Sequence, residues 1–475
     1  MRQAKGKLDV LLIKPNVDIV NMVPPLGLGY LASALIRNGF QVDIKDCRRE
    51  NAAIEDAVRL VSERQPKIVG ISVCTNETGW AKECIRQLKR SAAVSIVIGG
   101  PHPTGLGKDI FDDMPDIDFA VYSEGEEAFP KLSDAILRNA ISDETLRGIP
   151  NLIWKGASVT VNPLKLQDNL DELTFPAFHL MEPAWYPRRP HGGFSRAFPT
   201  APIITTRGCP YPCRFCGARL MHGNRIRHRS VGNVIEEITL LTERYNVREI
   251  HIEDDNFTFK KEFVMSLCDR IVRMDKKILF SLPNGIRLDR IDHEMLSAMK
   301  YAGFYSMAVG IESGSQRTLD RMKKNLSVEF IREKVSLIKR TGFIVKGFFM
   351  LGYPGETPQD LELTARFAKS LELDRASFSV FIPLPGTPDY EDLIAQGAFD
   401  RRAISWENFY TGNLNNIPYS PSGMSKSEVQ RFVTKALLAF YMRPRVLLKM
   451  FLSITSPEQV RFLFSRVKSL ILRIK

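Results

Sequence analysis

Short apolar runs alternate with amphipathic stretches along the first 140 residues. Five runs have the length of buried strands: 9–14, 41–46, 67–73, 95–100 and 118–123. Between them, apolar residues recur at helical spacing over 26–38, 52–63 and 80–90. Gly39 follows the first of these stretches and Pro66 follows the second, as expected of helix ends. Strands separated by helices predict an α/β fold with a doubly wound parallel sheet, which binds ligands beyond the carboxyl ends of its strands.

The same alternation resumes near residue 202. Six more strands are predicted at 203–206, 249–253, 279–283, 305–312, 344–351 and 376–382. Helical stretches separate them at 234–245, 262–274, 330–340 and 360–373. In the third stretch Ile331, Val335 and Ile338 recur at helical spacing, so they should face the sheet. Six strand–helix units predict a partial (βα)6 barrel of the TIM type, with its chemistry at the strand ends.

These patterns divide the chain into four parts. We expect a doubly wound domain at 1–145, a connector at 146–197, the partial barrel at 198–400 and a helical, basic extension at 401–475. Within the connector, two short apolar runs around Lys155-Gly156-Ala157 predict a small hairpin. Proline-rich and aromatic sequence follows it, which suits a segment lying across two domains.

Three of the seven cysteines lie in one loop flanked by Gly and Pro: Cys209, Cys213 and Cys216. Thiolates this close can hold three corners of an iron–sulfur cube, and a fourth iron without a protein ligand can bind a small molecule. A structural zinc ion with His222 or His228 as its fourth ligand is the alternative, although the paired Cys-x2-Cys layout of zinc sites is missing.

The arrangement Cys-x3-Cys-x2-Cys, with Phe215 just before the last cysteine, resembles the radical S-adenosylmethionine (SAM) superfamily. The resemblance implies that Cys209, Cys213 and Cys216 hold a [4Fe–4S] cluster and that SAM chelates its fourth iron through amino and carboxylate groups. It also implies that Phe215 lies near the adenine of SAM.

Further residues at predicted strand ends resemble the SAM-contacting motifs of that superfamily. They are Asp254, Asp255, Arg287, Glu312, Ser313 and Leu351. The resemblance implies that acidic and amide groups hold the methionine ammonium and that Arg287 holds its carboxylate. One departure is that Asp254-Asp255-Asn256 replaces the usual Gly-Gly-Glu after the second barrel strand. A solvated loop carboxylate is the alternative for Asp254, Asp255 and Glu312.

The first domain resembles the cobalamin-binding domain found upstream of many radical SAM cores. The residues that carry the resemblance are Pro25, Gly27, Ser72, Cys74, Gly99, Gly100, His102 and Glu124. The glycine pair would leave room for the nucleotide tail of cobalamin. The usual Asp-x-His-x-x-Gly after the first strand is absent, and Lys14-Pro15-Asn16 stands there instead. Cobalt would then lack a protein imidazole, unless His102 replaces it; a hydrogen-bonding surface role is the plainer alternative for His102.

A competing motif lies in the same region. The run Gly27-Leu28-Gly29-Tyr30-Leu31-Ala32 fits the dinucleotide fingerprint, and Asp46 is placed for a ribose contact. However, a dozen residues with three prolines separate the first strand from Gly27, whereas the fingerprint starts directly after its strand. A helix that begins after Pro24-Pro25 is the simpler interpretation.

Charge is concentrated in the tail. The formal net charge is +12, and residues 443–475 carry eight Lys and Arg against one acidic residue, Glu458. The rest of the chain is nearly balanced, so we expect no nucleic-acid partner. Apolar tail positions at helical spacing predict a helix that lies on an anionic membrane surface or docks on the protein itself. No apolar leader and no 18-residue apolar run are present, so we expect a cytoplasmic protein, peripheral to the membrane at most.

The resemblances imply an enzyme that forms a 5′-deoxyadenosyl radical after an external donor of the flavodoxin or ferredoxin type reduces its cluster. With cobalamin present, methylation of an unactivated carbon of a small molecule, natural product or lipid such as a hopanoid is the expected outcome. Oxidative cyclisation of a tetrapyrrole, as in the anaerobic protoporphyrin ester cyclases, is one alternative. A cobalamin sensor without catalysis is another.

Overall fold

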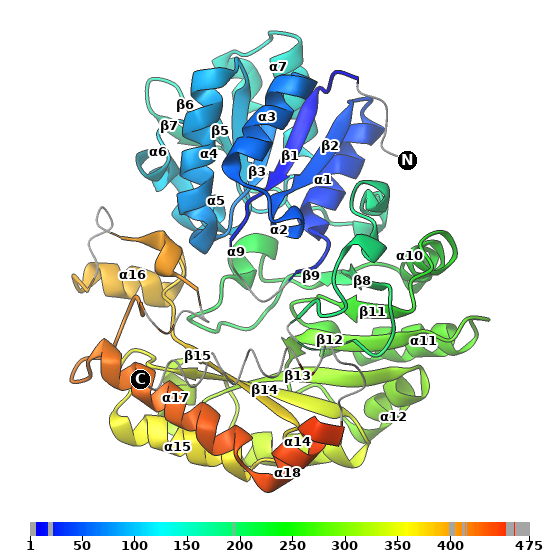
Figure 1. Ribbon diagram of the computed structural model, residues 1–475, viewed down its shortest axis with the longest axis vertical. Coiled ribbons are helices and arrows are strands. Elements are labelled where there is room, and N and C mark those ends of the chain that lie inside the picture. Colours follow the sequence, from blue (N-terminus) through cyan, green and yellow to red (C-terminus); the bar gives the residue numbers. More distant parts are fainter. Residues whose placement is uncertain are drawn as a thin grey trace.

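The computed structural model describes residues 6–17, 22–191, 193, 195–398, 404–410, 414, 416–452 and 460. Two α/β units are stacked, with the N-terminal unit at the top of Figure 1 and the second unit below it. The short helix α9 (Ala218–His222) lies between them.

The N-terminal sheet has seven strands in the order β2-β1-β3-β4-β5-β6-β7. Their bounds are β1 Val10–Lys14, β2 Val42–Asp46, β3 Ile68–Ser72, β4 Ser95–Gly99, β5 Phe119–Val121, β6 Leu152–Lys155 and β7 Val159–Val161. The first five are parallel, which confirms the predicted doubly wound sheet. The helices that surround it are α1 Leu26–Arg37, α2 Cys47–Glu50, α3 Ile54–Arg64, α4 Thr78–Ser91, α5 Pro101–Leu106, α6 Ile110–Asp113, α7 Ala128–Leu137 and α8 Asp143–Arg147.

The predicted hairpin forms, but it belongs to this sheet rather than to a separate connector. Strand β6 pairs antiparallel with β5 and then with β7. This pairing covers the backbone groups that β5 would otherwise leave unpaired at the edge. The N-terminal sheet therefore extends past residue 145, and the linking segment begins only after β7.

The second sheet has six parallel strands in the order β15-β14-β13-β12-β11-β8. Their bounds are β8 Thr200–Ile203, β11 Glu249–Ile252, β12 Leu279–Ile286, β13 Phe304–Glu312, β14 Ile344–Leu351 and β15 Arg375–Val380. The helices along it are α10 Val231–Arg244, α11 Lys261–Val272, α12 His293–Tyr301, α13 Gln316–Arg321, α14 Val328–Arg340, α15 Pro358–Ser370 and α16 Pro388–Ala395. In α14, Ile331, Val335 and Ile338 are buried, as their spacing predicts.

The first barrel strand ends earlier than predicted. It occupies 200–203 rather than 203–206, and the chain then forms β9 (Thr206–Arg207), which pairs antiparallel with β10 (Arg227–His228). This small ribbon supports the loop that carries the three cysteines.

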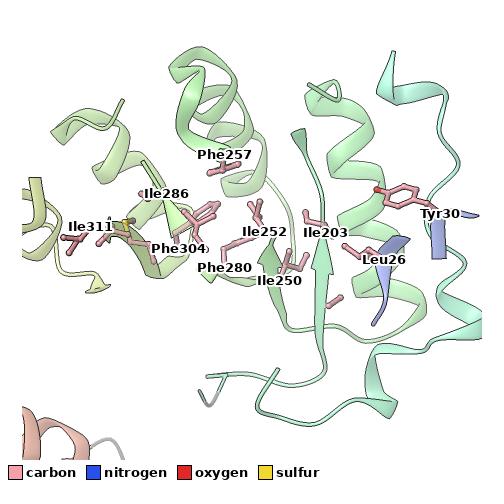
Figure 2. Close-up of a cluster of buried hydrophobic side chains, with 14 of the residues drawn as sticks. Leu26, Tyr30, Ile203, Ile250, Ile252, Phe257, Phe280, Ile286, Phe304 and Ile311 are labelled. Atoms are coloured by element: carbon pink, nitrogen blue, oxygen red, sulfur yellow. The ribbon is translucent and has the colours of Figure 1, made fainter. Parts of the chain in front are cut away.

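One apolar core joins the two units. Figure 2 shows Ile250 and Ile252 of β11 with Phe280 and Phe304 of the next strands, and Leu26 and Tyr30 of α1 lie in the same cluster. Phe178 and Met181 of the linking segment are buried in this cluster too. The two units therefore share buried surface, which holds their facing ends in a defined orientation.

The C-terminal helices α17 (Lys426–Tyr441) and α18 (Pro444–Leu452) pack on the second sheet. The Tyr441 hydroxyl donates to the carbonyl of Ala376 in β15 at 2.8 Å, and Lys449 pairs with Asp374 at 2.7 Å. This part of the tail docks on the protein itself. Residues 453–459 and 461–475, where the rest of the predicted amphipathic helix falls, lie outside the described residues. In the described part of the chain, we find no helix with the length and apolarity to cross a bilayer.

Candidate functional site

The three cysteines predicted as ligands lie together in the loop between β9 and α9. All three thiols are free and partly exposed. Gly208 has a φ of +96°, and a Cβ there would lie 2.2 Å from the carbonyl oxygen of Arg225, so only glycine lets the loop sit against β10. Burial raises the pKa of Cys209, and that of Cys216 to about 12. Such thiols gain stability from a metal that binds them as thiolates.

The spacing of these thiols does not support the zinc alternative. Among the described residues, only one group of His, Cys, Asp or Glu side chains is placed to share a single metal ion, and it contains no cysteine. One of the two proposed fourth zinc ligands, His222, is also engaged elsewhere. His222 Nδ1 lies 3.1 Å from Glu124, and the His228 ring packs on Phe263.

Two cations border the cysteine loop. The Arg287 guanidinium stacks on Tyr211 at 3.5 Å, and its Nη1 lies 3.8 Å from Cys213 Sγ. Lys324 pairs with Glu312 at 2.8 Å. Although burial opposes its charged form, Glu312 and Cys213 hold the pKa of Lys324 above its usual value. The sequence analysis missed Tyr211 and Lys324; the position of Tyr211 inside the cysteine motif was a usable signal, whereas Lys324 gave none.

The two neighbouring aspartates, Asp254 and Asp255, lie in different surroundings. Its carboxylate accepts hydrogen bonds from the Thr205 backbone at 2.6 Å and from the Thr206 hydroxyl at 2.9 Å. Burial raises the pKa of Asp254 to about 6. Asp254 therefore holds the chain where it leaves β8, and its contact with SAM stays a prediction. Asp255 lies on the cysteine side, where its charge contributes to the raised pKa values of the thiols.

The remaining predicted SAM contacts are also divided. The prediction that the Ser313 side chain contacts SAM needs correction, because its buried hydroxyl is engaged by Thr364 at 2.9 Å and by the Ser315 backbone at 3.1 Å. Leu351 is fully buried at the end of β14. Phe215 packs against a small buried cluster that includes Tyr353 and Phe381. Glu312 has a φ of +66° and turns toward Lys324.

In the N-terminal unit, the predicted glycine positions lie at the carboxyl edge of the sheet. Gly100 follows β4 with a φ of +98°, and a Cβ there would meet Val73 and Ser72 at 3.1–3.2 Å. Gly99 and Gly27 are less crowded: a Cβ on Gly99 would meet only one atom within 4 Å, and one on Gly27 would meet none. Gly27 follows Pro25, which precedes the first turn of α1. The backbone at Gly27 and Gly99 can therefore be approached closely by a ligand, whereas Gly100 lets the chain turn tightly against Val73.

The alternative dinucleotide motif has a structural explanation instead. A Cβ on Gly29 would lie 2.1 Å from Met181 Cε, and the Gly29 carbonyl accepts from the Ala177 backbone. Asp46, the candidate ribose contact, accepts a hydrogen bond from the Tyr186 hydroxyl at 2.9 Å. Gly29 and Asp46 thus dock the linking segment, which leaves no reason to invoke nicotinamide.

Lys14 stands where the cobalamin domain usually begins its histidine motif, and it forms a buried ion pair. Lys14 Nζ lies 2.6 Å from Glu77 and 3.8 Å from Cys74 Sγ. The predicted surface position of His102 needs correction. His102 is fully buried in α5, its Nε2 lies 3.1 Å from Asp113, and its ring packs on Trp406. His102 is thus not a surface residue, and its Nε2 is engaged by Asp113, whereas its Nδ1 is buried without a hydrogen-bond partner.

The prediction that Glu124 contacts cobalamin also needs correction, because this residue joins the two units. Its carboxylate accepts from Arg227 Nη1 at 2.9 Å and Nη2 at 2.6 Å, from the Gln167 backbone at 2.9 Å, and contacts His222. Burial alone would raise the pKa of Glu124, but the bonds from His222 and Arg227 and the charge of Arg207 hold it well below its usual range. Each oxygen of the Glu124 carboxylate already has two partners at this junction, so the carboxylate is not available to cobalamin.

Other contacts bring the open ends of the two sheets face to face. The Ser123 hydroxyl, after β5, donates to the carbonyl of Met221 in α9 at 2.6 Å. A Cβ on Gly105 of α5 would lie 2.4 Å from the carbonyl oxygen of Pro385, in the loop after β15. The cysteine loop therefore lies where the carboxyl ends of both sheets converge.

Comparison with known proteins agrees with this architecture. The Radical SAM superfamily profile matches residues 203–368 and the B12 binding domain profile matches residues 16–133. An uncharacterised methyltransferase of Pyrococcus horikoshii is 31% identical over 448 residues, which cover 93% of this chain and 94% of that protein. The cytidylyl-2-hydroxyethylphosphonate methyltransferase of Streptomyces wedmorensis is 28% identical, with 86% of each chain covered.

A solved structure shows the same fold. The radical SAM methyltransferase TsrM from Kitasatospora setae, determined with cobalamin and a [4Fe-4S] cluster, has a TM-score of 0.71 at 18% identity, covering 93% of this chain and 92% of that one. Both resemblances drawn from the sequence are confirmed. The chain belongs to the family of cobalamin-dependent radical SAM methyltransferases.

Proposed function

We propose that this enzyme methylates an unactivated carbon of a small molecule by a radical mechanism that uses a [4Fe–4S] cluster, SAM and cobalamin. One observation carries the proposal: three free thiols lie in the loop before α9, which contacts the carboxyl edge of the other sheet through Ser123. The methyltransferase relatives support the same reaction class. Bound there, the groups supply reductive SAM cleavage to a 5′-deoxyadenosyl radical and a transferable methyl group.

The residues of the barrel would hold the first two groups. Cys209, Cys213 and Cys216 provide three thiolates, and the described cysteines elsewhere are buried or lie beside Lys14. The donor set fits a cube with one open iron. Arg287 and Lys324 offset the negative charge of the thiolates, and Asp255 is the acidic group left to hold an ammonium.

The N-terminal residues would hold cobalamin. Gly27 and Gly99 leave backbone open at the sheet edge, which fits a bulky planar ligand and its tail, and Gly100 forms the turn after β4. The Lys14–Glu77 pair occupies the place of the missing imidazole motif, and His102 is committed to Asp113. We therefore assign no protein imidazole to the lower face of cobalt.

The test uses anaerobically reconstituted enzyme, cobalamin, a strong reductant and SAM labelled in its methyl group. We expect about four iron ions per chain, formation of deoxyadenosine, and movement of label from SAM to cobalamin before any substrate is added. Cys213→Ala removes all three, whereas Cys268→Ala, at a buried thiol in α11, retains them. Deoxyadenosine without movement of label would contradict methyl transfer and support a cyclase. Absence of SAM cleavage would support a sensor.

A further inference from the structure

The inner face of β11 carries a second group of side chains that bind metals well. Glu249 and His251 of β11, and Glu253 directly after it, alternate with Ile250 and Ile252, which point into the core between sheet and helices in Figure 2. His191, from the linking segment, lies over this inner face. One ligand atom each from His191, His251 and Glu253 lie within 4.8 Å of one another.

Glu249 fixes the orientation of His251. Its fully buried carboxylate lies 2.8 Å from His251 Nε2 and accepts from the Tyr305 hydroxyl at 2.7 Å. The backbone N–H groups of Arg196 and Ala197 donate to its other oxygen at 2.7 and 2.8 Å. A carboxylate held in this way accepts a hydrogen bond from the Nε2–H group of His251, so His251 Nδ1 keeps its lone pair. This is the arrangement by which a carboxylate orients a metal-binding histidine.

One of the three inward atoms has no partner, and the other two contact each other. His251 Nδ1 is buried and makes no hydrogen bond to any described residue, whereas His191 Nε2 and Glu253 Oε1 lie 2.7 Å apart, which is the distance of an ion pair when His191 is protonated. Buried polar atoms without partners are rare, because each carries a desolvation penalty of about 1–3 kcal/mol. An unpartnered His251 Nδ1 beside a second imidazole and a carboxylate indicates that a bound species satisfies it.

We propose that His191, His251 and Glu253 bind one divalent transition-metal ion, Zn²⁺ or Fe²⁺, separate from the cysteine loop. Two imidazoles and a carboxylate are the protein ligands both ions accept. Bonds of about 2.0–2.1 Å require ligand atoms about 3.3 Å apart, so small side-chain rotations close the site. Three protein ligands leave a coordination position for water or for an oxygen of a bound small molecule.

The test measures metal content of the anaerobic, cluster-loaded enzyme after equilibration with Zn²⁺ and desalting. We expect about one zinc per chain besides the cluster iron, and at least a tenfold loss of zinc in His191→Ala, His251→Ala and Glu253→Gln. Glu249→Gln weakens zinc binding by about 10- to 100-fold, because His251 loses its orienting partner. The matched control is His179→Ala, at an exposed histidine of the same linking segment, which keeps its zinc.

Two further measurements separate this site from the others. Unchanged cluster iron in each variant shows that it folds, and zinc should raise the melting temperature of the wild type but not of Glu253→Gln. A parallel experiment with Fe²⁺ in place of Zn²⁺ shows which of the two ions the site retains better after desalting. A chain with all three loop cysteines changed to Ser should still bind one zinc. Loss of zinc from that chain, zinc retention in all three ligand variants, or no ion beyond the cluster in the wild type would each overturn the site.

Discussion

Replacing Glu124 by alanine should loosen the junction between the two units. Glu124 and Arg227 are both almost fully buried and share two hydrogen bonds. Removing one partner of a buried ion pair costs about 3–5 kcal/mol. Arg227 would keep the carbonyl oxygens of Gln167 at 2.6 Å and His222 at 2.9 Å, so we expect the lower end, about 3 kcal/mol. That corresponds to about a 100-fold change in the unfolding equilibrium.

The assay is urea unfolding followed by tryptophan fluorescence and circular dichroism, with a double-mutant cycle. Glu124→Ala, Arg227→Ala and the double variant should each lose a similar amount, because either single change already breaks the pair. Glu127→Ala is the control, since its pairs with Lys131 and Lys165 are exposed and worth under about 1 kcal/mol. Additive losses, or a loss from Glu124→Ala no larger than the control's, would refute the assigned role.

The remaining predictions concern pH and two single positions. Because the folded pKa of Glu124 is lowered, its stabilisation is complete above the unfolded pKa of about 4.3 and is lost as the pH falls toward the folded value; the stability difference from Glu124→Gln should shrink in acid unfolding titrations. His102→Ala should leave the absorption spectrum of bound cobalamin unchanged and lower stability by about 1–3 kcal/mol in urea unfolding, since Asp113 loses a buried partner; a spectral change would restore His102 as a ligand. Gly105→Ala should push Pro385 away and increase proteolysis at the junction, whereas Gly232→Ala, with only Ser230 nearby, should not.

Much of the fold was predictable because strand and helix signals are local. The five parallel strands of the first sheet and the six of the second appear as apolar runs separated by amphipathic stretches, and the structure moves most of their ends by only one or two residues. The cysteine loop was predictable for the same reason, since its spacing lies within eight residues. The hairpin was predicted as a hairpin, but its membership of the first sheet was not, because the pairing of β5 with β6 joins residues 31 to 35 positions apart.

The residue periodicities and the cysteine and glycine motifs alone determined the two α/β units, the family and the edges where cofactors would bind. Only the tertiary structure decided what individual polar side chains do. Asp254 holds the chain where it leaves β8, Glu124 joins the two units, and His102 packs against Trp406. His191 contacts Glu253, which lies 62 positions further along the chain. The reason is physical: periodicity is a property of neighbours in sequence, whereas the charge and hydrogen bonds of a buried group are set by whichever distant segments fold against it.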